Sequence, residues 1–177
     1  MGVDLDSVLA PGIGPDEVRR GFGSIGLVAP EELIVWYGWH NGVRLTPGDK
    51  YVGLPPFVVQ ANLDWSISNY RYQVSEGIPA GVWAENWFCM ESDRGLAAYC
   101  SGNATDLPLL RREQVEEYDF LDASIAHQIV SLCTMVSWWI EALSIGAVRP
   151  IHDRGRPAWA YQGDLLTSID HGTYILV

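Results

Sequence analysis

The sequence predicts an α+β fold, in a single domain whose antiparallel or mixed β-sheet is flanked by helices. Three observations favour this class. Apolar residues recur with helical spacing at 30–42, 63–74 and 123–145. Aromatic and β-compatible residues at 83–91 and 96–101 predict strands, and no internal repeat or linker separates the two patterns. At 177 residues, the chain is long enough to bury one hydrophobic core.

The first of these helices shows both of its ends in the sequence Pro-Glu-Glu-Leu-Ile-Val-Trp-Tyr-Gly-Trp-His-Asn-Gly at 30–42. Pro30 suits the first helical position, where its missing N–H is not needed, and the two glutamates after it favour the positive end of the helix dipole. Asn41 and Gly42 predict a left-handed C-cap. The spacing places four residues on one face: Leu33, Trp36, Tyr37 and His40.

Shorter elements are predicted on either side of this helix. Residues 3–9 predict a short helix, and residues 15–20 begin another that ends in a glycine-rich turn at 21–26. A loop and then a short strand are expected within 46–59. Asn62 is the predicted N-cap of the helix that follows it.

The middle of the chain predicts a hairpin and then the longest helix. Residues 92–95 provide the turn between the two strands, and 107–110 predict a third strand. The helix at 123–145 keeps its apolar residues on one face, and Asp122 or Ser124 is its candidate N-cap.

The chain changes character near its C-terminus, where the segment 149–157 is rich in arginine and proline. A short helix at 164–169 and a terminal strand at 174–177 are expected there. We expect residues 146–177 to form a C-terminal extension that packs on the same domain as residues 1–145.

The charge balance restricts the partners. Eleven basic residues against twenty-two acidic ones give a net charge of −11, and Lys50 is the only lysine. A phosphate backbone or an anionic membrane surface requires neutralising Lys or Arg, so we expect no direct binding to nucleic acid or membranes. A basic protein partner fits this charge, as does solubility alone. No basic leader begins the sequence, and polar residues interrupt the most apolar stretch, 125–148, so we expect a cytoplasmic protein.

Three cysteines, Cys89, Cys100 and Cys133, lie in apolar sequence surroundings. We expect three reduced thiols in the core of a cytosolic protein. A Cys89–Cys100 disulfide across the hairpin is the alternative, and it requires an oxidising compartment. No Cys-x-x-Cys spacing predicts a metal site.

Three segments resemble the N-terminal part of the SUKH superfamily, also called the Smi–Knr-like domain. They are Pro-Asp-Glu-Val at 15–18, Gly-Leu-Val-Ala-Pro-Glu-Glu-Leu at 26–33 and Trp-Tyr-Gly-Trp-His-Asn-Gly at 36–42. The last of these, the signature 36–42, is similar to the family's helix that ends in Tyr-x-x-His-Asn-Gly or a near variant.

The resemblance continues more loosely to residue 145. Residues 63–72 resemble the family's middle helix, 87–100 its strand pair, and the helix that begins near residue 123 its late helix. The proline that the family often has soon after the strand tryptophan has no counterpart at 88–90, and residues 146–177 have none either. The resemblance implies a structural role for its motif residues, which are Trp36, Tyr37, His40, Asn41, Gly42, Trp87 and Gly95.

The resemblance implies a protein-binding domain without a catalytic residue, cofactor or metal. Bacterial members look mainly like immunity proteins, encoded beside polymorphic or contact-dependent toxins, many of them nucleases, which they would neutralise by direct binding. Fungal members look like regulatory scaffolds. We therefore expect an immunity protein whose partner is a cognate toxin, with a regulatory or scaffold domain of the same fold as the alternative. The sequence does not set the oligomeric state.

An acid-dense segment at 113–122 is the candidate docking surface. It offers negative charge to the basic cleft of a toxin, in the manner of nucleic acid, and such charge speeds association. A solvated connector before the long helix explains the same residues equally well. Trp83 and Trp87 are candidates for interface anchors or for core residues. The candidate partner-binding residues are Glu85, Glu91, Asp93, Glu113, Glu116, Glu117 and Asp119.

Catalytic interpretations of the sequence lack a second group at a suitable spacing. His40 is the obvious candidate, but a histidine at a helix C-terminus is expected to interact with the helix dipole and its neighbours. The pairs His152-Asp153 and Asp170-His171 do not have the spacing of metal ligands. A small enzyme that uses His40, or His152 with Asp153, is therefore only a third hypothesis.

Overall fold

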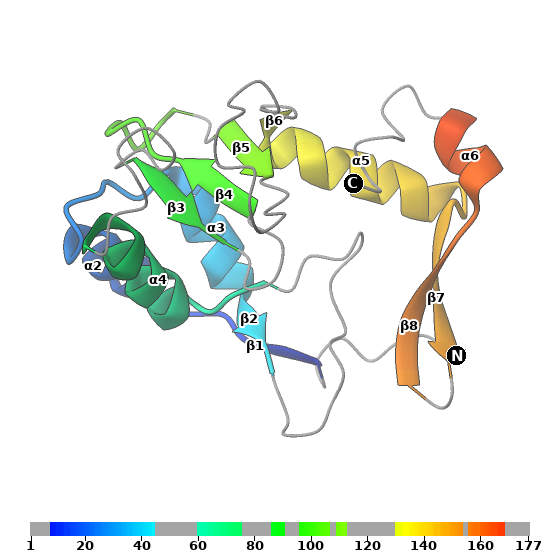
Figure 1. Ribbon diagram of the computed structural model, residues 1–177, viewed down its shortest axis with the longest axis horizontal. Helices are drawn as coiled ribbons and strands as arrows, with labels where there is room; N and C mark the ends of the chain where they lie inside the picture. The colour runs from blue at the N-terminus through cyan, green and yellow to red at the C-terminus, as the bar shows by residue number, and fades with distance from the viewer. Residues whose placement is uncertain are drawn as a thin grey trace.

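Helices and antiparallel strands combine in this protein, which confirms the predicted α+β class (Figure 1). The computed structural model describes residues 8–44, 60–75, 86–90, 96–106, 109–112, 130–153 and 156–168. In chain order the elements are β1 (Leu9–Pro11), α2 (Pro15–Gly23), α3 (Glu31–Trp39), β2 (His40–Val43), α4 (Leu63–Ser75), β3 (Trp87–Cys89), β4 (Leu96–Tyr99), β5 (Leu109–Arg112), β6 (Val130–Ser131), α5 (Leu132–Ser144), β7 (Val148–Asp153), β8 (Arg156–Tyr161) and α6 (Gly163–Ser168).

All strand pairs among the described residues are antiparallel. The main sheet has the order β3-β4-β5-β6, and its β3–β4 pair confirms the predicted hairpin, with Trp87 opposite Tyr99. The predicted third strand is present as β5, where Leu110 pairs with Val130 of β6. Two further pairs, β1 with β2 and β7 with β8, complete the strands.

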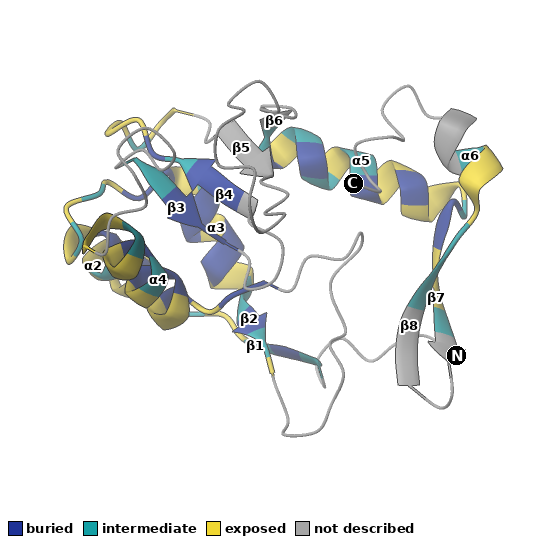
Figure 2. Ribbon diagram, viewed as in Figure 1, coloured by how far each residue is buried: buried dark blue, intermediate teal, exposed yellow. Residues whose placement is uncertain are grey.

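The main core brings together side chains from α2, α3, α4, α5 and the β3–β4 pair (Figure 2). Trp36 and Tyr37 of α3 are buried there, as their helical spacing predicts. Phe22 of α2 lies against Phe88 of β3, with ring centroids 4.3 Å apart. Trp139 of α5 lies 6.2 Å from Trp36, so α5 covers the same core.

The predicted end of the first long helix is wrong. α3 ends at Trp39, and His40 has extended dihedral angles, φ −147° and ψ 138°, because it begins strand β2. Gly42 does have a positive φ of 86°, but inside the strand and not at a helix C-cap. At the other end, Pro30 is the N-cap and not the first helical residue.

The N-terminal predictions are correct for α2 and partly correct for its surroundings. α2 continues to Gly23, so the predicted glycine-rich turn at 21–26 is reduced to residues 24–26 and ends at Gly26, whose φ is 77°. Gly21 faces α4, where a Cβ atom would lie 2.9 Å from side-chain carbons of Leu63 and Ile67. Its lack of a side chain lets the two helices pack closely. Val8 is helical, as predicted for the short helix at 3–9, whereas Leu9 belongs to β1.

The helix predicted at 123–145 begins later than predicted and, at 13 residues, is as long as α4. Residues 130–131 are strand β6, and α5 starts at Leu132. Ser131 is its N-cap, since the Ser131 Oγ accepts a hydrogen bond of 3.1 Å from the backbone N–H of Thr134. The helix ends at Ser144, next to Gly146 with φ 75°, which agrees with the predicted end.

The β7–β8 hairpin was not predicted, whereas the helix α6 was. The N–H of Gln162 donates to the carbonyl of Ala147 at 2.9 Å. Hydrogen-bonded and non-hydrogen-bonded residue pairs alternate in an antiparallel ladder, so this bond shows which pairs of β7 and β8 are hydrogen-bonded. Pro150 and Pro157 therefore fall at positions whose nitrogen points to the outer edges of the pair, where no ladder hydrogen bond is lost.

A second, smaller core joins this hairpin to the end of α5. Ala142 of α5 is buried with Ala147 and Val148, and Trp138 and Trp159 pack against them. α5 thus runs from the main core to the hairpin (Figure 1).

Several predictions lie outside the described residues and keep the status of predictions. They concern the short helix at 3–7, the loop and strand at 46–59, the turn at 92–95, the start of the long helix at 123–129 and the strand at 174–177.

Candidate functional site

The signature 36–42 forms a junction between α3, β1 and the start of α4. His40 Nδ1 lies 3.0 Å from the carbonyl oxygen of Ala10 in β1, and the His40 ring packs on Trp39 with centroids 4.6 Å apart. The side-chain amide of Gln60 donates a 2.6 Å hydrogen bond to the His40 carbonyl, and the Val43 N–H donates to the Gln60 carbonyl at 3.0 Å. His40 is the C-cap of α3, as predicted, with its backbone N–H bonded to the Trp36 carbonyl, and its side chain also holds strand β1 in place.

Asn41 caps the following helix from a distance in the sequence. Its side-chain oxygen accepts a 2.8 Å hydrogen bond from the N–H of Leu63, the first residue of α4. Asn62 Oδ1 accepts a second bond of 2.8 Å, from the N–H of Trp65, and this confirms the predicted N-cap. Two of the N–H groups that a helix start leaves unpaired are thus satisfied.

Gly42 is needed at this junction for two reasons. Its φ of 86° is unfavourable for residues with a side chain. In addition, a Cβ atom would lie 2.6 Å from the N of Asn62 and 3.0 Å from the carbonyl carbon of Ala61, both backbone atoms. Only glycine therefore fits at this position, because the backbone at residues 61–62 lies too close for a side chain.

Tyr37 anchors the junction from inside the core. Its side chain is fully buried, and its hydroxyl lies 3.2 Å from the Ser66 Oγ of α4. Burial raises the pKa of Tyr37 well above its usual range, against a smaller lowering effect of the Ser66 hydrogen bond. The phenol is therefore held in its neutral form, as a structural hydrogen-bonding group.

The cysteines are free thiols. Cys89 pairs with Ala97 across the hairpin, and Cys100 lies beyond Tyr99 on the other strand, so the register separates them by roughly 10 Å along the strands. A disulfide needs a much shorter approach. Burial raises the pKa of Cys100 to about 12. Cys133 is exposed, so the expectation of three core thiols is correct only for the other two.

Two further motif residues, Trp36 and Trp87, contribute to packing. Trp36 lies between Trp39 and Trp139, with centroids 5.8 and 6.2 Å away. Trp87 is partly buried and packs edge-on against Tyr99 at 5.3 Å.

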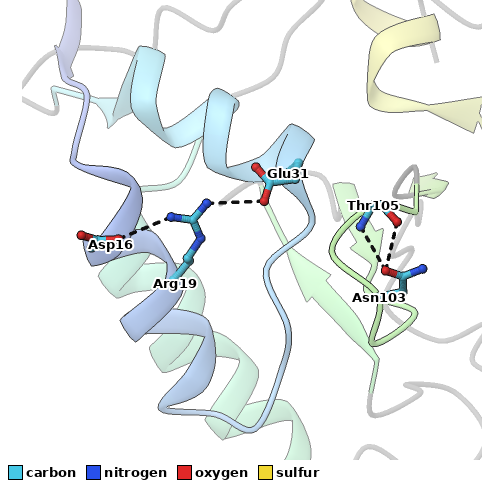
Figure 3. Close-up of polar contacts among 5 residues, drawn as sticks. All are labelled: Asp16, Arg19, Glu31, Asn103 and Thr105. Atoms are coloured by element: carbon cyan, nitrogen blue, oxygen red, sulfur yellow. Dashed lines mark hydrogen bonds and ion pairs between the residues drawn. The ribbon is translucent and has the colours of Figure 1, made fainter.

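Polar contacts fix both sides of the start of α3. The Arg19 guanidinium lies 3.4 Å from the carboxylates of Asp16 and of Glu31 (Figure 3). Asn103 Oδ1 accepts hydrogen bonds from the Thr105 N–H and hydroxyl, at 3.2 and 3.0 Å, and shapes the neighbouring loop. The Glu31 N–H donates to the carbonyl of that loop's residue 104 at 2.8 Å. These exposed ion pairs contribute little to stability.

Glu32 connects α3 to the N-terminus of α5. Burial raises the pKa of the Glu32 carboxyl, and a hydrogen bond from the Cys133 backbone acts in the opposite direction. A carboxylate at the start of a helix is favoured by the helix dipole. The Glu32 side chain therefore connects α3 to α5, the helix that leads to the β7–β8 hairpin.

None of the candidate docking residues lies in the described part of the chain, so the structure does not place them on one surface. Glu85, Glu91, Asp93, Glu113, Glu116, Glu117 and Asp119, and the motif residue Gly95, all lie outside that part. The described residues carry nearly equal numbers of acidic and basic side chains, so most of the negative excess belongs to the segments outside them.

A cleft of about 320 Å³ between α2 and α4 was not predicted from the sequence. Gly21, Leu63 and Ile67 line its middle, where the two helices pack most closely. The Arg71 guanidinium donates a 3.1 Å hydrogen bond to the Ser24 Oγ, which places the C-terminal ends of both helices at one end of the cleft.

The charges of this cleft are separated along its length. Arg20 and Arg71 line the end at the helix C-termini, and Glu17 and Asp64 line the end at the helix N-termini. The helix dipoles favour Glu17 and Asp64 in the first turns and Arg20 in the last turn of α2, whereas Arg71 precedes the last turn of α4. Within the described residues, none of these four side chains has an ion pair. The acidic residues at the start of both helices could be recognised in the sequence. The parallel packing of α2 and α4, which brings these residues together, could not.

The described ranges contain no group of three or more His, Cys, Asp or Glu side chains able to hold a metal ion. His152 and Asp153 lie on β7, opposite Pro157 and Arg156, and the Asp170-His171 pair lies outside these ranges. In the same part of the chain, no helix combines the length and the apolar character needed to cross a membrane.

Comparison of the chain with models of known protein families, with curated proteins and with solved structures found no match.

Proposed function

We propose that the protein is an immunity protein that binds a cognate bacterial toxin in the cytoplasm and neutralises it by direct contact, without catalysis or a cofactor. The observation that carries the proposal is the use of the signature 36–42. Its polar groups hold the fold together, with His40 on Ala10 and Asn41 on Leu63. That use is what the resemblance to the SUKH superfamily implies for these residues.

The charge of the chain supports a protein partner with a basic surface. The net charge is −11, and the acidic excess is concentrated in segments such as 113–122, away from the nearly neutral described residues. A nuclease toxin has a basic cleft for its substrate, and an acidic protein segment competes for the same groups. Opposite charges on two partners increase the rate of association.

A regulatory or scaffold domain of the same fold remains the second candidate, because the junction would serve it equally well. The adjacent gene distinguishes the two. A toxin gene beside this one favours the immunity role, and a neighbourhood without a toxin favours the regulatory role.

The first test is co-purification of the tagged full chain with the product of the adjacent gene, followed by measurement of the complex at increasing salt. We expect a tight complex that forms more slowly at high salt, since salt screens exposed charges. A folded, monodisperse protein that forms no complex would reject the immunity role.

A further inference from the structure

The outward side of α4 is unusual for a surface helix. Trp65 and Tyr72 lie seven residues apart on it and are 39% and 62% exposed. Two turns of an α-helix separate these positions, so both side chains lie on the same face, opposite the buried Ile67 and Tyr70. Ser68, which is small and exposed, lies between the two aromatic residues. Large exposed aromatic side chains of this kind are enriched at protein interfaces.

One flank of this face is the charged cleft between α2 and α4. Asp64 lies at its acidic end with Glu17, and Arg71 lies at its basic end with Arg20. None of the four side chains has an ion pair among the described residues. All four residues are exposed, so their charges face solvent.

The spacing around Ser68 is self-complementary. Asp64 and Trp65 precede it by four and three residues, and Arg71 and Tyr72 follow it by three and four. A two-fold axis through Ser68 would lay α4 antiparallel to α4 of a second copy. Asp64 then faces Arg71 of the second copy, and Trp65 faces its Tyr72. The two-fold axis repeats both contacts, so each occurs twice in the dimer. The acidic end of one cleft meets the basic end of the other.

We propose that two copies of the chain associate through α4 in this way. The surface is nearly neutral in a strongly acidic protein, so charge repulsion between two copies is small here. An isologous contact of this type closes on itself and stops at a dimer. A helix of 13 residues buries less area than the roughly 800 Å² per partner of a standard interface, so we expect a weak, reversible dimer. This association does not depend on the immunity role.

The test is sedimentation velocity of the purified full chain across low micromolar to millimolar concentration. We expect reversible doubling of the mass. Ser68→Arg places a large charged side chain at the axis and should leave a monomer. Ser137→Arg, at an exposed position of α5, is the matched control and should leave the dimer intact.

Charge exchange tests the register. Arg71→Asp places like charges together at two symmetric positions and should weaken the dimer about a hundredfold, or tenfold for each position. The double variant Asp64→Arg/Arg71→Asp restores opposite charges and should recover most of the affinity. Circular dichroism and thermal unfolding confirm that each variant is folded. A wild-type chain that stays monomeric throughout, or a dimer that persists in Ser68→Arg, would overturn the proposal.

Discussion

The side-chain oxygen of Asn41 accepts a 2.8 Å hydrogen bond from the backbone N–H of Leu63, twenty-two residues further along the chain. This bond joins the end of the α3–β2 unit to the first residue of α4. Together with Gly42, which packs against the backbone of Asn62, it explains why an Asn-Gly pair follows the histidine of the signature. The pair serves a contact between distant segments.

Asn41→Ala should lower the free energy of unfolding by about 1 kcal/mol, because it removes an acceptor from the start of α4. Asn41→Asp keeps an oxygen in place beside a helix N-terminus and should retain most of the stability. Urea denaturation of both variants measures the difference. Equal losses in the two variants would show that the cap is not the source of the effect.

Gly42→Ala should destabilise the protein far more than Gly26→Ala. Both positions have positive φ, 86° and 77°, so alanine is strained by about 1 kcal/mol at each. Only Gly42 lies against backbone atoms, whereas the space beside Gly26 is open. We expect an additional loss of about 2 kcal/mol or more for Gly42→Ala from this overlap. Thermal and urea unfolding report both variants. Similar stabilities would contradict the close approach at Asn62.

Ser131→Ala should cost about 1 kcal/mol, since it removes the N-cap of α5. Ser137 lies inside the same helix, where its hydroxyl bonds only to the Cys133 carbonyl at 2.8 Å. Ser137→Ala is therefore expected to be neutral or slightly stabilising, because alanine is the better helix former. The comparison by urea unfolding tests whether α5 starts at Leu132. A harmless Ser131→Ala would place the start elsewhere.

Stability should fall as the pH rises from about 9 toward 12, in part because of Cys100. Its folded pKa of about 12 lies above the ordinary value of 9.0. Across this interval the unfolded chain loses the thiol proton and the folded chain keeps it, so the slope is negative, up to about 1.4 kcal/mol per pH unit for this group. Cys100→Ala should flatten the slope by that amount. Cys133→Ala, at an exposed position, should leave it unchanged, and an unaltered slope in Cys100→Ala would contradict the assignment.

Neutralising acidic residues in the segment 113–122 should slow association with the toxin. Glu116→Gln/Glu117→Gln removes two charges there, and Glu17→Gln/Glu141→Gln removes two exposed charges elsewhere. Stopped-flow or surface binding at low salt should show a lower association rate for the first pair only, by about tenfold. If both double variants associate with the toxin at the same rate, the overall charge of the chain, and not the segment 113–122, determines that rate.

Periodicity predicted much of the fold from the sequence. The buried face of α3, with Trp36 and Tyr37, follows from helical spacing, and the β3–β4 pair follows from the aromatic strand residues around a turn. Helix ends were less accessible. Asn-Gly is compatible with a helix C-cap and with a strand that passes close to another segment, and only the contact with Asn62 decides between them.

Other features depend on pairing that a single segment does not reveal. Val130 and Ser131 fall within the helix predicted at 123–145, yet they pair with β5 as strand β6. Pro150 and Pro157 argued against strands, and they are tolerated because their nitrogens lie on the open edges of the hairpin. The parallel packing of α2 and α4, which gathers opposite charges at the two ends of the cleft, is a tertiary property of the same kind.

Protection of cells tests the central claim most directly. The product of the adjacent gene is expressed from an inducible promoter, with and without this chain, and survival is counted. We expect the toxin alone to kill, and co-expression of this chain to restore growth while Gly42→Ala, if unfolded, does not. Death in the presence of the soluble, folded wild-type chain would contradict the account.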